Sequence, residues 1–295
     1  WELKAAVIPP DWFDRVDASQ ATAPPRERPA LAHQRDLIAT LLDDRRPRAD
    51  ATVLAAMVDE LDVMLGRLAA TGTSLPAGGS YRALMPADEG LPPLACSLAL
   101  PEGWRRGQDV RAVAVLARAP GGEQRAVKRA PRLLAERAGE RDTPPIVLAV
   151  PHLPRTHDPA MARAVVARLL PWLRDLLGCG PIRVAGVDLL ATTVLEAAAA
   201  GDPDLAGALM ITGVGFAPWP DEGPGALGQR LLGIPDGLPL GWIWFPDEQQ
   251  PGDQAAMLRR LLKAQGHALQ PETAVPGGLG FAQAWSRAVL WAAGL

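Results

Sequence analysis

The stretch that most constrains the fold of this chain runs from Ile182 to Ala200. It begins with an apolar segment, turns at a Gly-Val-Asp sequence, and continues into an alanine-rich segment that favours a helix. A segment that is apolar on both faces is typical of a central strand in a parallel sheet. We therefore expect a buried strand, a sharp turn over Gly186–Leu190 and a helix that follows directly.

The same alternation recurs along the chain from about residue 80. Apolar segments fit strands at 81–85, 94–100, 110–117, 145–150, 207–213 and 238–245. Amphipathic segments fit helices at 123–139, 159–178, 253–265 and 281–293. Strands that alternate with helices specify an α/β fold, here a doubly wound, mostly parallel sheet with helices on both faces. We assign residues 73–295 to this sheet domain.

The N-terminal residues differ in composition from the rest. Residues 1–30 carry several prolines among charged and small residues, which predicts an extended arm or linker. Trp1, Trp12 and Phe13 are the side chains that would anchor such an arm, either to its own domain or to a partner protein.

A helical hairpin is expected over residues 31–72. Apolar side chains repeat at helical spacing from Leu54 to Leu68, and Gly72 is placed to end the second helix. Such an apolar stripe must be covered, so the hairpin is expected to dock against another surface.

Composition excludes several classes of function. A net charge of −3 gives no sign of a nucleic-acid-binding surface, and no apolar run approaches the roughly 20 residues that span a bilayer. The histidines have no metal-ligand spacing, and we expect no cofactor and no metal. Cys96 and Cys179 fit buried free thiols, with a disulfide left open if the protein is exported. The chain begins with Trp1 rather than Met, which we interpret as a processed product or a part of a longer protein, and a periplasmic or extracellular location is slightly favoured.

Short motifs from residue 80 onward follow a fixed order. They are Leu98–Trp104, Val113–Gly122, Val150–His152, Gly186–Leu190, Trp244–Pro251, Gln254–His267 and Pro276–Phe281. In this order they resemble an α/β-hydrolase of the secreted esterase, depolymerase or dipeptidyl-peptidase type. The resemblance implies that Gly186–Leu190 is the nucleophile elbow, a G-x-S-x-G turn that holds the catalytic serine.

Measured against that resemblance, the catalytic residues are altered. Asp188 stands at the position of the serine nucleophile, and Leu279 stands at that of the histidine base. Asp247, or Glu248 beside it, keeps a carboxylate at the acid position, while Ala117-Arg118 replace the His-Gly pair of the oxyanion loop. Hydrolysis needs a nucleophile, a base and an oxyanion hole together. No functioning catalytic residue is therefore expected.

One alternative is an active hydrolase of an ester, peptide or halide. Haloalkane dehalogenases and epoxide hydrolases use aspartate at the elbow, but they need a histidine to hydrolyse the covalent ester. His152 follows a strand on the same expected edge of the sheet and is the only outside candidate for that base. An unrecognised nucleophile also stays open.

Tryptophan usage points towards protein partners. The chain has nine tryptophans but four phenylalanines and one tyrosine, and tryptophan is enriched at interfaces. Towards the C-terminus the candidates are Trp242, Trp244, Trp285 and Trp291, although at least half of the tryptophans are expected to fill the core. The sequence thus predicts an inactive hydrolase-like subunit of a bacterial protein complex, with membrane association only through a partner.

Overall fold

The computed structural model describes residues 8–43, 49–85, 94–116, 146–151, 159–187, 189–212, 219, 222–244, 253–274 and 286–291. Its helices are α2 (Trp12–Thr22), α3 (Arg28–Asp43), α4 (Ala49–Thr71), α6 (Pro159–Leu177), α7 (Leu189–Ala199), α8 (Pro224–Leu231) and α9 (Asp253–Ala264). Its strands are β1 (Gly79–Met85), β2 (Leu94–Leu100), β3 (Arg111–Leu116), β4 (Ile146–Pro151), β5 (Ile182–Val187), β6 (Leu205–Thr212), β7 (Leu240–Trp244) and β8 (Leu269–Ala274). Residues 286–291 are also helical.

The described strands form one sheet in the order β1-β2-β4-β3-β5-β6-β7-β8. β2 runs antiparallel to β1 and to β4, and all other neighbouring strands are parallel. The central strands are buried almost throughout, as strands covered on both faces must be. The predicted α/β class with a doubly wound, mostly parallel sheet is confirmed.

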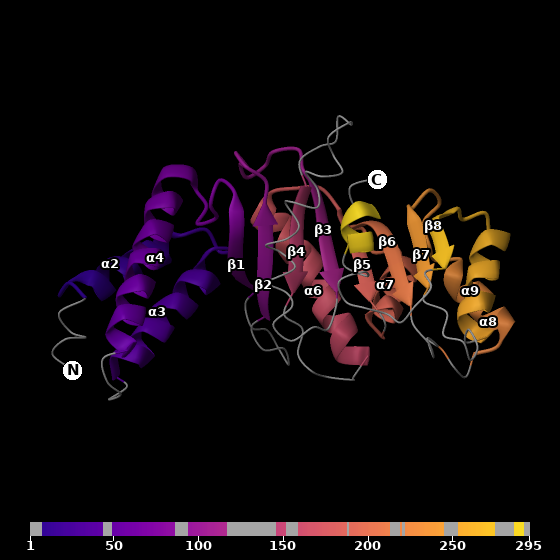
Figure 1. The fold of residues 1–295 in the computed structure, drawn as a ribbon, viewed down its shortest axis with the longest axis horizontal. Helices are drawn as coiled ribbons and strands as arrows, with labels where there is room; N and C mark the ends of the chain where they lie inside the picture. Colours follow the sequence, from indigo (N-terminus) through magenta and orange to yellow (C-terminus); the bar gives the residue numbers. More distant parts are fainter. Residues whose placement is uncertain are drawn as a thin grey trace.

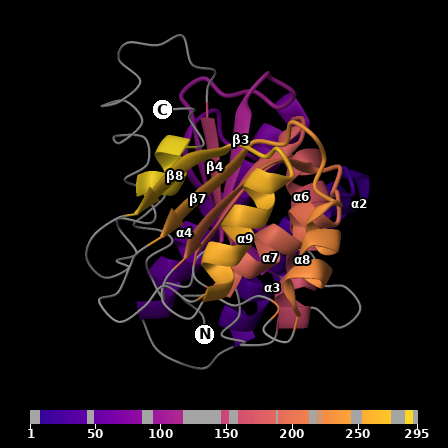
Figure 2. The same cartoon turned by 90° about the vertical axis from the view of Figure 1, so that its right-hand side faces the viewer.

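Each face of the sheet has its own hydrophobic core. Helices α6, α7, α8 and α9 cover one face, and the helical residues 286–291 lie on the other, as Figure 2 shows. On the first face the leucines of α6, with Leu169 and Leu173 among them, are fully buried. On the second face Val113 and Ile211 pack with Trp291. Because both faces are covered, the functional edges are the two ends of the strands.

The N-terminal helices α2, α3 and α4 pack together beside β1, at one end of the sheet (Figure 1), and are called the helical layer below. They bury a third core of their own, made of Trp12, Val16, Leu31, Ile38, Leu54, Val58, Leu61 and Met64. The predicted hairpin is confirmed as α3 and α4. Gly72 ends α4 with a φ of 71°, and its N–H donates to the Leu68 carbonyl.

Residues 1–30 were expected to form an extended arm, but Trp12–Thr22 within them form helix α2. Trp12 and Val16 lie one helical turn apart and are both fully buried against the hairpin, so tertiary packing stabilises a helix that its composition did not suggest. The helix ends at Thr22 because Ala23 precedes Pro24, and a residue before proline is pushed into extended conformation. Trp1 lies outside the described residues.

Two elements were not among the predicted segments. Helix α8 contains two glycines and buries only Leu227 and Leu231, so it has no long apolar stripe. Strand β8 is an edge strand that buries only Leu269 fully. The helix expected at 123–139 lies outside the described residues, and no helix in the described ranges is long and apolar enough to cross a bilayer.

Candidate functional site

The β5–α7 junction has the tight geometry that the sequence predicted. β5 ends at Val187 and α7 begins at Leu189, so the junction falls at position 188 of the chain. A Cβ atom built on Gly186 would lie 2.7 Å from the carbonyl carbon of Leu190 and 2.7 Å from Cγ2 of Val194. Only glycine fits where the helix crosses back over the strand this closely. Asp188 itself lies outside the described residues.

Leu190, which stands at the elbow's second glycine position, is accommodated inside the protein. Its side chain is 3% exposed and belongs to the core beneath α7, together with Val194 and Leu195. The leucine therefore adds buried apolar area to the α7 face. The first glycine position is sterically demanding in this chain, and the second holds a core residue.

The other positions that the resemblance assigns to the catalytic site lie outside the described residues, but the strands that precede several of them are described. Ala117-Arg118 follow β3, His152 follows β4, and Asp247 follows β7 after two intervening residues. These strands are parallel to β5, so their carboxyl ends share one edge of the sheet. Leu279 lies in the undescribed stretch between β8 and the helical residues 286–291.

The described histidines lie away from this edge. His33 is exposed on α3 in the helical layer. His267 lies in the turn before β8, at the amino end of that strand and so at the opposite edge of the sheet. Neither is placed to activate a nucleophile at the carboxyl end of β5.

The two cysteines are free thiols in poor environments for a nucleophile. Cys96 is buried, and burial raises the pKa of its thiol. Partial burial also raises the pKa of Cys179. A thiol needs a lowered pKa to react as a thiolate at neutral pH, so both fit structural positions. Within the described ranges, no three His, Cys, Asp or Glu side chains are grouped so that they could hold a metal ion.

The tryptophans proposed as interface anchors are mostly core residues. Trp12 is fully buried and its Nε1–H donates to Asp62 Oδ1 at 2.9 Å. Trp242 is also fully buried and donates to Thr212 Oγ1, and Trp291 donates to the Gln270 carbonyl. The structure thus corrects the expectation that these three anchor a partner, because each is largely buried and has its N–H bonded within the chain.

Three further anchor candidates have different outcomes. Phe13 is half-buried, stands edge-to-face against Trp12, and lies under the Arg35 guanidinium. Trp244 is half-buried, and the Arg259 guanidinium stacks 3.8 Å from its ring centre. Trp285 lies outside the described residues.

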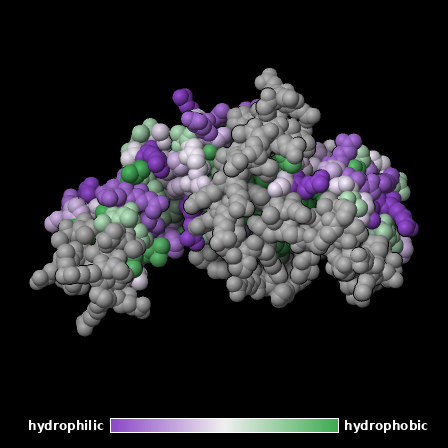
Figure 3. Space-filling model, in the orientation of Figure 1, coloured by the Kyte–Doolittle hydropathy of each residue, from purple (hydrophilic) through white to green (hydrophobic). Residues whose placement is uncertain are grey.

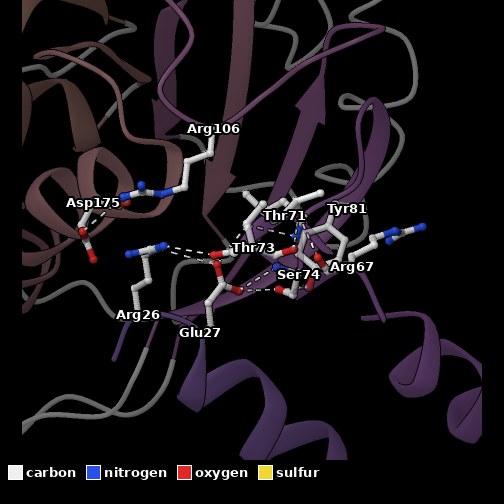
Figure 4. A network of polar contacts seen from close by, with 11 residues as sticks. Arg26, Glu27, Arg67, Thr71, Thr73, Ser74, Tyr81, Arg106 and Asp175 are labelled. Carbon is white, nitrogen blue, oxygen red and sulfur yellow. Dashed lines mark hydrogen bonds and ion pairs between the residues drawn. The ribbon is translucent and has the colours of Figure 1, made fainter. Parts of the chain in front are cut away.

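A buried carboxylate joins the helical layer to the sheet domain (Figure 4). Glu27 is 1% exposed and accepts hydrogen bonds from Thr73 Oγ1 at 2.9 Å, from Ser74 Oγ at 2.5 Å and from Ser74 N at 3.2 Å. Arg26 Nε lies 3.7 Å from the same carboxylate and partly balances its charge. Buried charges are stable only when paired and hydrogen-bonded in this way.

Tyr81 on β1 extends this network into the sheet. Its hydroxyl lies 3.4 Å from Ser74 Oγ. Burial raises the pKa of Tyr81 from 10.0 to about 12, and the nearby Glu27 carboxylate adds to the increase. Sequence reasoning missed this network, because Glu27 lies in a stretch expected to be an extended arm or linker.

Solved structures of hydrolases share this fold. The siderophore hydrolase EstA from Aspergillus nidulans aligns with a TM-score of 0.50 over 74% of this chain and 95% of its own, at 11% identity. Poly(aspartic acid) hydrolase-1 from Sphingomonas sp. KT-1 aligns over 74% of this chain and 99% of its own, with a TM-score of 0.49 and 12% identity. A lidless α/β serine hydrolase from Xanthomonas campestris covers 74% of this chain and 94% of its own, with a TM-score of 0.44 and 17% identity.

The fold is therefore α/β-hydrolase-like, as the sequence resemblance implied. At this level of identity the likeness concerns the fold and carries no residue roles. No family model and no curated protein matches the sequence.

Proposed function

We propose that this chain is an α/β-hydrolase-fold protein that has lost hydrolytic chemistry and acts as a binding or structural subunit. The observation that carries the proposal is the β5–α7 junction. Its backbone packing still demands glycine at position 186, while the chain places aspartate at 188 and leucine at 279. The backbone geometry of an elbow is thus present, while the residues at the nucleophile and base positions differ from those of a serine hydrolase.

The chemical reason for inactivity is the second half of the reaction. An aspartate carboxylate can displace a leaving group from an alkyl carbon, but the resulting ester needs a water molecule activated by a base. Leucine at position 279 cannot supply that base, and the described histidines lie in the helical layer and at the opposite edge of the sheet. One covalent event without release is the most that this arrangement supports.

The helical layer is the best candidate for the binding role. Three large apolar side chains are exposed within the described residues, and two of them, Leu37 (39%) and Val63 (50%), lie on α3 and α4. In Figure 3 the surface at this end of the molecule mixes hydrophobic and hydrophilic areas. The layer also packs against the edge strand β1, which protects that strand from pairing with other chains.

The runner-up is an active hydrolase that uses Asp188 or an unrecognised nucleophile. Retention of the tight junction at Gly186 favours it, because that geometry is what exposes a nucleophile in related enzymes. His152, directly after β4 in the sequence, would then have to serve as the base.

Catalysis is tested with p-nitrophenyl esters of increasing chain length, assayed on the wild-type protein and on Asp188→Asn. We expect both to match the rate without protein. A wild-type rate that disappears in Asp188→Asn would establish the runner-up and overturn the proposal.

The binding role is tested by isolating the tagged full chain from its native source. Leu37→Lys combined with Val63→Lys should remove the copurifying protein. Leu232→Lys is the matched control, since Leu232 is 61% exposed but lies after α8, away from the helical layer. Equal loss in both variants, or in neither, would reject the helical layer as the attachment surface.

A further inference from the structure

A hollow of about 890 Å³ opens at the edge of the sheet opposite the elbow. It is lined by residues of β5, β7 and β8, by residues 236–239 and 265–268 before the last two strands, and by Arg287, Leu290 and Trp291 of the C-terminal helical segment. Arg183 near the start of β5 and Val187 at its end are roughly 13 Å apart, so this hollow is separate from position 188. Its volume lies within the range of about 300–1,000 Å³ that is typical of small-molecule sites.

The charged groups of the hollow favour an anion. Arg183 and Arg287 line it together with His267, and Asp236 is the one carboxylate among the described lining residues. The Arg183 guanidinium lies 5.4 Å from the ring centre of Trp291 and donates to the Trp291 carbonyl at 3.3 Å, which fixes its direction. Partial burial and the nearby Arg111 lower the pKa of Arg183.

Part of the remaining wall is apolar, beside the amide side chains of Gln265 and Gln270. Leu238 and Leu290 are half-buried in it, and Trp291 contributes its ring. A wholly polar ion such as inorganic phosphate would leave this wall in contact with water. A ligand that carries an anionic group and an apolar body would satisfy both parts of the hollow.

We propose that this hollow binds a small organic anion with an apolar body, with its charged group at Arg183 and Arg287 and its body along Leu238, Leu290 and Trp291. Guanidinium groups suit a carboxylate because they offer several N–H donors in a planar fork. The site is independent of the proposed loss of hydrolytic chemistry, because it lies at the other ends of the strands and needs no reaction.

Calorimetric titration of the full chain with sodium butanoate, hexanoate and octanoate, and with inorganic phosphate for comparison, tests the proposal. Affinity should rise about fourfold for each methylene that becomes buried. Hexanol, which lacks the charge, should bind at least about tenfold more weakly than hexanoate. Hexyl phosphate is included to show whether the anionic group is read as a carboxylate or only as a charge; binding of either anion supports the site.

The variants locate the binding. Arg287 is exposed, so Arg287→Glu should leave the fold intact, and it should weaken hexanoate binding by about tenfold or more. Arg82→Glu is the matched control, since Arg82 is exposed on β1 at the other end of the sheet. No binding of any alkyl anion, equal binding of hexanol, stronger binding of inorganic phosphate, or equal effects of the two variants would each overturn the proposal.

Discussion

The β5–α7 junction and the attachment of the helical layer are held by different kinds of contact. At the junction the backbone of α7 lies so close to Gly186 that no side chain fits between them. At the helical layer a single buried carboxylate, Glu27, gathers hydroxyl and N–H donors from Thr73 and Ser74. The junction contact is steric and joins residues that are close in sequence. The Glu27 contact is polar and joins Glu27 to Thr73 and Ser74, which lie 46 and 47 positions further along the chain.

This difference explains which region the sequence could reveal. A steric demand leaves a mark at one position, because only glycine meets it, and the flanking strand and helix are recognisable by their patterns. A buried polar network leaves no periodic mark, since any of many charged residues could have been its centre. The strand–turn–helix of the junction can therefore be recognised in this sequence, whereas the Glu27 network cannot.

The largest expected effect is at the junction. Gly186→Ala should lower the free energy of unfolding by about 3 kcal/mol, because the new Cβ would overlap the Leu190 backbone, which cannot move without shifting α7. Gly180→Ala is the same change at a position where no atom lies within 4 Å of the added Cβ, and it should cost less than about 1 kcal/mol. Chemical denaturation of both variants measures this. Equal losses would mean that the junction is not tightly packed.

A smaller effect is expected at the helical layer. Glu27→Gln keeps the shape but removes the charge, and it turns an acceptor oxygen into a donor that faces other donors, so it should cost about 2 kcal/mol. Glu60→Gln on the exposed side of α4 is the control and should change stability by less than about 0.5 kcal/mol. Hydrogen exchange should show the extra opening in α2–α4 first. If exchange accelerates equally in α6 and α7, Glu27 stabilises the whole chain and not the attachment of the helical layer in particular.

The smallest expected effect is the change with pH in the free energy of unfolding that arises from Tyr81, which lies next to Ser74 in the Glu27 network. Because the pKa of Tyr81 rises to about 12 in the folded chain, the folded state keeps this proton while the unfolded chain ionises near 10.0. Stability from this group is thus fully present below pH 10 and should decline between pH 10 and 12, by on the order of 1–2 kcal/mol.

Tyr81 is the only tyrosine in the chain, so its tyrosinate absorbance can be followed without overlap from another tyrosine. The decline assigned to this group should be absent in Tyr81→Phe. A titration midpoint near 10.0 in the folded protein would show that the Glu27–Ser74–Tyr81 network is open to water.

Much of the sheet domain could be predicted from the sequence because its strands are apolar on both faces. The range expected for β2 matches the structure, and those for β3 and β4 agree within one residue at each end. Helix α2 could not be predicted, because Trp12 and Val16 gain their burial only from residues of α3 and α4. Burial also separates core tryptophans from interface tryptophans, and composition alone does not.

The candidate sites also differ in how far the sequence could predict them. The elbow was predicted from one glycine between a strand and a helix, and the described flanks agree with that prediction. The hollow at the amino ends could not be predicted, because Arg183, His267 and Arg287 are far apart in sequence and meet only through the crossovers of the sheet. The absence of a functioning catalytic triad at Asp188, Asp247 and Leu279 stays a prediction, because these positions lie outside the described residues.

The most direct test of the proposed loss of hydrolytic chemistry is the intact mass of the protein after prolonged incubation with 1-chlorohexane and, separately, with a fluorophosphonate. Displacement of chloride by a carboxylate would leave a hexyl ester on the protein, and a reactive serine would be phosphonylated. We expect the unmodified mass in both samples and no release of chloride above the rate without protein. A stoichiometric hexyl adduct on Asp188 without further chloride release would be the single covalent event that the arrangement still allows. Continuous chloride release that is absent from Asp188→Asn, or a phosphonylated serine, would contradict the proposal that this scaffold no longer carries out hydrolase chemistry.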